Sequence, residues 1–408
     1  MSTHQAPEQM LGYLYQVRYA LTLLLDNDNE KHQISIERFD DVAFSQDGTP
    51  KQMIQLKHHI KQHGNLSDAS TDIWRTLKVW IDAVSKDENL LTDTNFLIIT
   101  TAKAPEGSAA SLLKTDNRSE YAAYLKLKKI ADTSDNKEHQ TYYKVFSNLD
   151  EKIMKKLFGK VYVIDGASNV LDVSRDLHRL VRYSCMPKYE DQICERIEGW
   201  WYQRSIEALC SDTPIFYTQQ QVRSLIVSTS QQYADDNLPI DVWDHNTITP
   251  DDLSSNERIF YEQLKLICLG NRRISIAIRD YYRAFRQRAS WIRNDLLFVN
   301  ELEKYEQCLI DEWEHYFASM EDELSMFGSC ATEDTKIKCG QALFREIESG
   351  DIRIRPKVHD AFVMRGSYHI LANQLKIGWH IDFQERLKQI LSIQEGGIIH
   401  EKLGSEDT

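Results

Sequence analysis

An acidic side chain and a Gln-x-Lys tripeptide lie in two neighbouring segments whose composition favours strands. Asp41 stands in segment 33–44, and Gln55 and Lys57 stand two residues apart in segment 51–59. Side chains two residues apart on a strand point to the same face. If a hairpin sets that face beside Asp41, the three residues supply two oxygen ligands for a divalent cation and an ammonium group that orients water. The pattern predicts metal-assisted hydrolysis of a phosphodiester, with Mg²⁺ (or Mn²⁺) as the cofactor because Mg²⁺ prefers oxygen ligands.

The two segments are joined by a turn signal, Gln46-Asp47-Gly48-Thr49, in which glycine adopts a positive φ at little cost. In the first segment Ile34 and Ile36 alternate with polar residues, which is typical of a strand with one buried face. The segments are therefore predicted to form a β-hairpin. On a continuous strand 33–44, Glu37 would share one face with Asp41.

The elements around this hairpin alternate between helical and extended patterns, which predicts an α/β domain over residues 1–185. Helices repeat apolar residues every three or four positions, and short apolar runs suit strands buried on both faces. The helices are expected at roughly 8–26, 71–86, 119–131, 148–158 and 170–184, and the two buried strands at 95–101 and 160–166.

Strand signals become scarce after Met186-Pro187, and helical periodicity dominates from there on. Residues 186–408 are therefore predicted to form an all-α domain that follows the α/β domain. Its helices are expected at roughly 190–209, 218–234, 254–268, 273–290, 296–325, 334–348, 358–375 and 382–393.

The bulk properties favour a packed protein of more than one domain. The chain has 408 residues, which is too long for one ordinary hydrophobic core. Hydrophobic residues make up 42% of it, as expected of a packed globular protein. Its net charge of −13 argues against a surface that binds nucleic acid throughout, although a local basic groove is compatible with it. The seven cysteines are scattered without CxxC spacing, and no apolar run is long enough to cross a bilayer. We expect a cytoplasmic protein with reduced thiols, no zinc site and no membrane partner.

The residues around the hairpin resemble a known nuclease family. An acidic residue on one strand and a (D/E/Q)-x-K tripeptide on the next resemble the PD-(D/E)xK superfamily, and a glutamine in first position resembles its Mrr-type branch. Four motifs also resemble, in order, the effector nuclease domain of CD-NTase-associated antiphage systems and Lamassu-type operons. These motifs are Gly12-Tyr13-Leu14-Tyr15-Gln16, Glu37-Arg38-Phe39-Asp40-Asp41-Val42, Ile54-Gln55-Leu56-Lys57-His58 and Asp72-Ile73-Trp74-Arg75-Thr76-Leu77.

This resemblance covers roughly residues 8–185 and implies a restriction-endonuclease-like fold that cleaves double-stranded DNA. It implies that Asp41, Gln55 and Lys57 are the catalytic set. Within that set Asp41 and Gln55 would hold the metal, and Lys57 would act on water and the scissile phosphate. Gln16 and Glu37 would be supporting residues.

Later segments are similar to the helical C-terminal domain of the nuclease subunit in Lamassu and related ABC three-component systems. These segments run from Ser290-Trp291-Ile292-Arg293 to Tyr316 and include Arg355-Pro356 and Gly378-Trp379-His380-Ile381-Asp382. In those families the nuclease partners an SMC-like ATPase and a small third subunit. The resemblance implies an effector of an antiphage or antiplasmid defence complex. We hypothesise that partners hold the nuclease inactive and that homo-oligomers form on activation, because cutting both strands needs two active sites.

Other interpretations of the same residues stay open. Asp41 could instead be a residue at the end of a strand that pairs with a surface lysine. Lys57 could be a charged residue that protects an edge strand from pairing with other chains. Gln55 could be a solvent-exposed position of its strand. For the whole chain, the rival is a non-catalytic DNA-tethering or assembly subunit on a degenerate nuclease fold. The glutamine that replaces an acid favours it, because the metal then loses one negative ligand. RNA cleavage would use the same residues.

Three basic residues after the tripeptide, His58, His59 and Lys61, are interpreted as DNA-contacting residues at the rim of the site. A plain solvated loop explains them equally well.

An arginine-rich stretch with interleaved aromatic residues extends over 272–293. Because arginine and aromatic residues are enriched at interface hot spots, Arg283, Arg286 and Trp291 are interpreted as partner-binding. The alternative is a charged helix face whose arginines pair with local acids.

Overall fold

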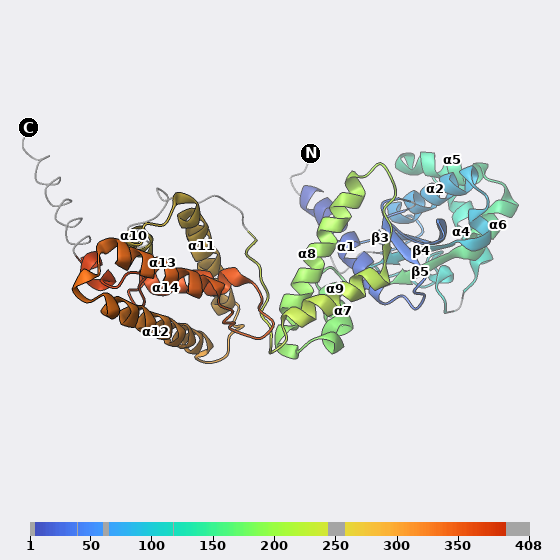
Figure 1. Cartoon of the computed structure of the whole chain (residues 1–408). Helices are drawn as coiled ribbons and strands as arrows, with labels where there is room; N and C mark the ends of the chain where they lie inside the picture. Colours follow the sequence, from blue (N-terminus) through green and yellow to red (C-terminus); the bar gives the residue numbers. More distant parts are fainter. Residues whose placement is uncertain (1–4, 39, 60–64, 117, 244–257, 389–408) are drawn as a thin grey trace, which may run out of the picture. The chain divides into compact units, whose positions relative to one another are not determined.

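The computed structural model describes residues 5–38, 40–59, 65–116, 118–243 and 258–388 of the chain (Figure 1). The chain divides into two compact units, Met1–Ser230 and Gln231–Thr408. The first unit is an α/β structure with a mixed sheet and the second is helical, as the sequence predicts.

The first unit builds its sheet from short strands and surrounds it with helices. The strands are β1 (Gln33–Ile36), β2 (Val42–Gln46), β3 (Thr49–Lys57), β4 (Asn95–Thr100), β5 (Val161–Asp165) and β6 (Tyr217–Thr218). The α-helices are α1 (Gln5–Leu25), α2 (Thr71–Lys86), α3 (Leu90–Asp93), α4 (Glu120–Thr133), α5 (Gln140–Asn148), α6 (Glu151–Lys160), α7 (Asp172–Val181), α8 (Glu190–Cys210) and α9 (Gln219–Gln232).

The strand order in the sheet is β5-β4-β3-β2-β1-β6. Strands β3, β4 and β5 run parallel, whereas β2, β1 and β6 continue the sheet in antiparallel fashion. Strands β4 and β5 are the two apolar runs that the sequence assigns to buried strands, and a parallel sheet is covered on both faces. Strand β3 therefore lies in the middle of the sheet, between an antiparallel and a parallel neighbour.

Two groups of helices cover the two faces of this sheet (Figure 1). On one face, helices α2, α4, α5 and α6 share a core with side chains of three parallel strands, namely Met53, Phe96, Ile98, Val161 and Val163. On the other face α1 packs against β1, α7 and α8. The sheet thus forms the middle of three layers, and a residue on β3 faces either α2 or α1.

The predicted hairpin is confirmed for β2 and β3. Asp47 and Gly48 both adopt positive φ, at 52° and 77°, which is the geometry of a two-residue turn between twisted antiparallel strands. The single predicted strand over 33–44 is wrong, however. The chain forms β1, turns at residues 37–41 and returns as β2, with Ile36 opposite Val42. Glu37 and Asp41 therefore do not share the face of a continuous strand.

The sequence-based boundary at residue 185 falls inside the first unit. Helix α8 contacts α1, α7 and β1, and β6 pairs with β1 at the edge of the sheet. Trp201 of α8 is buried and donates its indole N–H to the backbone oxygen of Val17, at 2.6 Å. Helical periodicity in residues 190–209 correctly predicts a helix, but it does not reveal the element against which that helix packs.

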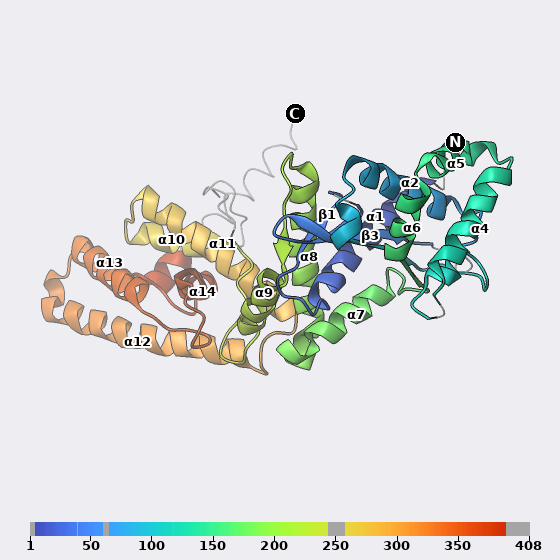
Figure 2. The same ribbon diagram turned by 90° about the vertical axis from the view of Figure 1, so that its right-hand side faces the viewer.

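The second unit consists of helices around a core of aromatic and aliphatic side chains. Its helices are α10 (Arg258–Leu266), α11 (Asn271–Arg293), α12 (Glu301–Phe327), α13 (Glu333–Ser349) and α14 (Ala361–Asn373). Helices α12 and α13 lie side by side (Figure 2), and α14 packs against α10, α11 and α12. His369 is fully buried in this core and burial lowers its pKa to about 3, so it is neutral at physiological pH.

Buried polar side chains fix the loops of the second unit. Arg355 is 4% exposed, and its guanidinium forms a bidentate ion pair with Glu301, with both N–O distances at 2.7 Å. The same guanidinium donates to the backbone oxygens of Asn237 and Leu296, each at 2.8 Å. One side chain thereby joins three segments that are far apart in the sequence, which explains its burial despite its charge.

The seven cysteines are free thiols, and Cys194 and Cys339 are buried. Burial raises the pKa of both thiols, to about 12 for Cys194, so neither is a ready nucleophile. In the described part of the chain, no helix combines the length and the apolar composition that a bilayer crossing requires.

Helices α11 and α14 approach each other closely at Gly366. A Cβ atom at this position would lie 2.0 Å from the backbone oxygen of Asp280 and 2.4 Å from Cβ of Ala284. We expect Gly366→Ala to lower the free energy of unfolding by roughly 1–3 kcal/mol, because the two helices must move apart. Urea unfolding monitored by circular dichroism measures the change. Gly270→Ala is the control, since no atom lies within 4 Å of a Cβ built there. Equal effects of both substitutions would contradict the close approach.

Candidate active site

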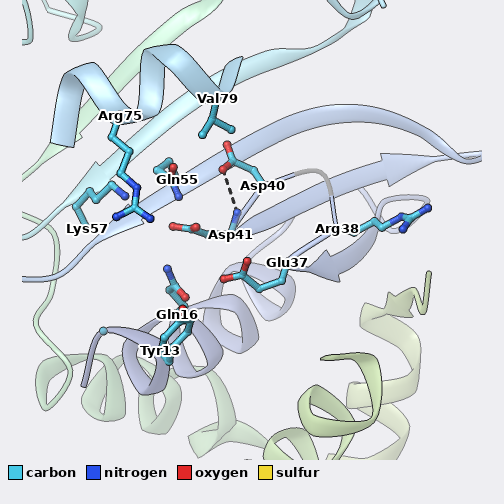
Figure 3. Close-up of a pocket in the computed structure, with 11 residues that line it drawn as sticks. Tyr13, Gln16, Glu37, Arg38, Asp40, Asp41, Gln55, Lys57, Arg75 and Val79 are labelled. Atoms are coloured by element: carbon cyan, nitrogen blue, oxygen red, sulfur yellow. Dashed lines mark hydrogen bonds between the residues drawn. The ribbon is translucent and has the colours of Figure 1, made fainter. Parts of the chain in front are cut away.

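The predicted catalytic residues line one cavity of about 520 Å³ in the first unit (Figure 3). We call it the Asp41 cavity. Residues from α1, the turn at 37–41, β3 and α2 form its walls. They are Gly12, Tyr13, Gln16, Glu37, Arg38, Asp40, Asp41, Gln55, Lys57, Arg75 and Val79. All five residues that the sequence analysis assigned to the catalytic and supporting sets are among them.

Asp41 is held at the edge of β2 by backbone hydrogen bonds. Its backbone oxygen accepts from the N–H of Glu37 at 2.9 Å, which closes the turn between β1 and β2. Its carboxylate Oδ2 accepts from the backbone N–H of Leu56 on β3 at 2.8 Å. Because Leu56 lies between Gln55 and Lys57, this bond places the carboxylate beside both side chains. One carboxylate oxygen thus positions Asp41, and the other oxygen is available to a ligand.

Gln55 and Lys57 reach the cavity from the same face of β3, as the alternation of side chains predicts. Gln55 is 5% exposed, and its amide forms no hydrogen bond with any described residue. Lys57 is half-buried and forms no ion pair in the described ranges. Both groups are therefore available to something bound in the cavity.

Asp40 is an important residue that the sequence analysis missed. It is 9% exposed and its Oδ2 accepts the indole N–H of Trp80 on α2. Its Oδ1 accepts the backbone N–H of Asp41 at 3.1 Å. Burial, together with the neighbouring charge of Asp41, raises the pKa of Asp40 to about 7. The available signal was two successive acids before a strand, but sequence spacing alone does not reveal the distant indole.

Glu37 lines the cavity near Gln16 of α1 (Figure 3). Its φ of 53° is unusual for a residue other than glycine, and it results from the tight turn between β1 and β2. Partial desolvation and the nearby Asp41 raise the pKa of Glu37 to about 7, while Lys57 opposes the shift. Two carboxyl groups in one cavity thus titrate near neutral pH.

Helix α2 supplies Arg75 and Val79 to the cavity, four residues apart on one helix face. The sequence predicts this helix at roughly 71–86 but does not indicate a role for Arg75. Ser70 caps the helix, and its side chain accepts the N–H of Asp72.

The histidines that follow β3 lie beside the cavity and make contacts within the unit. The ring of His58 lies 4.7 Å from that of the buried Tyr15, measured between centroids, and burial lowers the pKa of His58. His59 Nε2 lies 2.9 Å from Oδ2 of Asp72, and this hydrogen bond raises the pKa of His59. Lys61 lies outside the described residues. DNA contact by these three residues stays a prediction.

The three residues interpreted as partner-binding have different environments. Trp291 is 0% exposed and donates its indole N–H to the backbone oxygen of Pro239 at 2.7 Å. This residue therefore stabilises its own unit, because an indole without solvent access cannot contact another chain. The guanidinium of Arg283 lies 4.1 Å from the ring centre of Phe362, whereas Arg286 is exposed. Binding of a partner by Arg283 and Arg286 stays a prediction.

The donor atoms in the cavity suit a hard divalent cation. The carboxylates of Asp41 and Glu37 and the amide oxygen of Gln55 are oxygen ligands, which Mg²⁺ prefers. Among the described residues, no three His, Cys, Asp or Glu side chains form a cluster able to hold a metal without further ligands. Mg²⁺ does not require such a cluster, because it keeps several waters and takes ligands from substrate phosphates.

Comparison with known proteins gives one family match, in the second unit. Residues 260–387 match the family described as C-terminal domain 7 of the ABC-three component (ABC-3C) systems. The match supports a role in bacterial antiphage defence, in a complex with other subunits. No match was found among curated protein sequences.

Similar solved structures are Cap4 SAVED/CARF-domain containing receptors. The receptor of Moraxella osloensis is 12% identical, with a TM-score of 0.34, and the similarity covers 63% of this chain and 59% of that one. The receptor of Acinetobacter baumannii, with the cyclic trinucleotide 3'3'3'-cAAA, is 12% identical, with a TM-score of 0.30 and coverages of 65% and 61%. The chain thus spans about three fifths of the length of these receptors, and TM-scores this low do not establish a common fold.

The raised pKa of Asp40 gives a stability prediction. The pKa in the folded protein, about 7, exceeds the ordinary value of 3.8, so the folded state binds this proton more tightly than the unfolded chain does. The free energy of unfolding therefore falls as the pH rises between these two values. Asp40→Asn keeps an oxygen that accepts from Trp80 but cannot ionise. As the pH rises from 5 to 8, we expect the free energy of unfolding of the variant to increase by roughly 1–3 kcal/mol relative to that of the native chain. Urea unfolding of both proteins at pH 5 and pH 8 measures this difference in the free energy of unfolding. If the free energy of unfolding changed with pH equally in both proteins, the raised pKa of Asp40 would be contradicted.

Proposed function

We propose that the chain is a metal-dependent endonuclease that cleaves double-stranded DNA as the effector subunit of an ABC-three component defence system. The first unit would be a restriction-endonuclease-like nuclease domain, and the second would bind the other subunits. The observation that carries the proposal is the convergence of Asp41, Gln55 and Lys57 in one cavity, with the Leu56 N–H fixing Asp41 beside the other two. The family match of residues 260–387 supports the cellular role.

Each residue of the cavity would have a separate role in phosphodiester hydrolysis. Asp41 and Gln55 would hold Mg²⁺ or Mn²⁺ through oxygen atoms, and Glu37 lies close enough to the cavity to hold one of its waters. When bound, the cation would polarise the phosphoryl group and neutralise developing charge. Gln16, which reaches the cavity from α1, can donate a hydrogen bond to a phosphate oxygen or to an ordered water.

Lys57 would orient the attacking water and stabilise charge on the phosphoryl oxygens. The water oxygen forms a new bond to phosphorus while the bond to the leaving ester oxygen breaks. A proton of the attacking water passes to solvent, and the leaving oxygen takes a proton from solvent. The products are a phosphomonoester end and a hydroxyl end. Lys57 suits this role because it is half-buried and forms no ion pair with a described carboxylate.

A second candidate is a non-catalytic DNA-tethering or assembly subunit on a degenerate nuclease fold. Two observations favour it. Gln55 provides a neutral amide where an acid would add negative charge to the metal site, and the described residues lack a cluster of three acidic or other strong metal ligands. Of the two candidates, only the nuclease requires Lys57 for a chemical step.

Substitution of Lys57 separates the two candidates. We expect the full-length chain, together with the other subunits of its system, to cleave plasmid DNA in the presence of Mg²⁺. Lys57→Ala should slow cleavage on the order of 10²–10³-fold, because the charge that acts on the transition state is lost. Lys51→Ala is the matched control, since Lys51 lies on the same strand but outside the cavity and faces Asp93 at 3.5 Å. Intact plasmid under all conditions, or equal cleavage by both variants, would favour the assembly subunit. An RNA substrate tested in parallel distinguishes the two nucleic acids.

We also propose that the other subunits, an SMC-like ATPase and a small third subunit, restrain the nuclease until foreign DNA is sensed. The net charge of −13 supports this restraint, because it weakens encounter of the free chain with DNA. Cleavage of both strands would then require two nuclease domains side by side in a homo-oligomer.

Restraint of this kind has a measurable consequence for the isolated chain. As a monomer, it should cleave plasmid far more slowly than the activated complex does. This difference is measured by the rates of plasmid cleavage by the monomer, the resting complex and the complex with foreign DNA. Size-exclusion chromatography gives the oligomeric state of each sample. Rapid cutting by the isolated monomer would contradict the restraint but not the nuclease.

A further inference from the structure

The Asp41 cavity contains an arginine to which the proposed function assigns no role. Arg75 enters from α2, on the wall opposite the α1 wall that carries Gln16 (Figure 3). Its guanidinium is exposed and forms no ion pair or hydrogen bond with any described residue. An arginine in a cavity with three carboxyl groups would normally pair with one of them, so this lack of a partner needs a physical reason.

Three acids of this region accept hydrogen bonds from residues other than Arg75. Asp72, one turn earlier on α2, is bound by His59 at 2.9 Å. Asp40 accepts hydrogen bonds from the indole of Trp80 and the backbone of Asp41, and the carboxylate of Asp41 accepts from Leu56. The charge of Arg75 helps to lower the pKa of Asp72, but no described residue forms a hydrogen bond or ion pair with the guanidinium, which is therefore available to a ligand.

The charges in the cavity are separated in space. Figure 3 shows Arg75 beside Lys57 on one side of Asp41, whereas Glu37 lies on the other side. Arg38, the third cation of the lining, points away from this group. A phosphate in the cavity can therefore have the metal ion that Asp41 would bind on one side. On its other side it would have the positive side chains of Lys57 and Arg75.

The backbone that carries Arg75 has a fixed position. Trp74, next to it in the sequence, is 1% exposed and donates its indole N–H to the backbone oxygen of Asp68 at 2.8 Å. Trp80 is fully buried, and its bond to Asp40 links α2 to the residue that precedes Asp41. The distance between the helix that carries Arg75 and the turn that carries Asp41 is thereby constrained.

We propose that Arg75 is a further catalytic residue, which binds the non-bridging oxygens of the scissile phosphate opposite the metal-binding side of the cavity. This inference rests on the proposed nuclease function. A guanidinium can donate two parallel N–H bonds to a phosphate, which an ammonium group cannot do. These bonds strengthen as negative charge accumulates on the oxygens in the transition state. Lys57 then acts on water, and Arg75 orients and stabilises the phosphoryl group.

The test compares Arg75→Ala and Arg75→Lys with Lys78→Ala in the full-length chain with its partner subunits. Lys78 lies on the same helix, outside the cavity, and pairs with Asp82 at 2.5 Å. We expect Arg75→Ala to lower kcat for plasmid cleavage by about 10²–10³-fold with a smaller change in KM. Arg75→Lys should recover only part of this loss, and Lys78→Ala should cleave like the native chain. Similar melting temperatures of all variants show that folding is intact.

A second measurement does not depend on cleavage. Inorganic phosphate, added with Mg²⁺ to the isolated chain, should raise the melting temperature, and Arg75→Ala should lose this increase while Lys78→Ala retains it. An equal increase in both variants, or no increase in the native chain, would overturn the role of Arg75. So would plasmid cleavage by Arg75→Ala at the native rate, and either result would leave the nuclease intact. Conversely, phosphate binding that depends on Arg75, in a complex that cuts no nucleic acid, would overturn the nuclease and retain the phosphate site.

Discussion

The arrangement of the cavity depends on the buried carboxyl group of Asp40. This group accepts from the indole of Trp80 on α2 and from the backbone of Asp41 on the turn after β1. It therefore joins the layer of helices above the sheet to the loop that carries the central acid of the cavity. A charged carboxylate in this environment is unfavourable, which is why its pKa rises to about 7. Its two hydrogen bonds connect Trp80 of α2 with the backbone of Asp41.

The distribution of charge in the cavity follows from the elements that carry its residues. The acidic residues Glu37, Asp40 and Asp41 come from one short turn, whereas the cations Lys57 and Arg75 come from the middle strand and the helix above it. Arg38, a cation of the same turn, points away from the other charged groups of the cavity (Figure 3). A ligand with negative oxygen atoms and an associated cation is complementary to this separation, and a phosphodiester with Mg²⁺ has these properties.

The second unit is stabilised by helix packing and by buried polar side chains. Its helices pack around aromatic residues, and buried polar groups fix the intervening loops. Gln263 donates to the backbone oxygens of Ala372 and Ile377, at 2.7 and 3.1 Å, while Arg355 connects Glu301 with two further segments. This unit contains the part of the chain that matches an ABC-three component domain.

The sequence by itself determined the local elements and the main members of the cavity. Apolar periodicity located α2 and the parallel strands, the Asp47-Gly48 turn fixed the hairpin, and alternation on β3 put Gln55 and Lys57 on one face. These features depend on neighbours in the chain. Only the tertiary structure revealed the break at residues 37–41, the bond between Asp40 and Trp80, and the position of Arg75. It also put α8 in the first unit and Trp291 in a core. Those outcomes depend on contacts between residues far apart in the sequence, which periodicity and spacing do not encode.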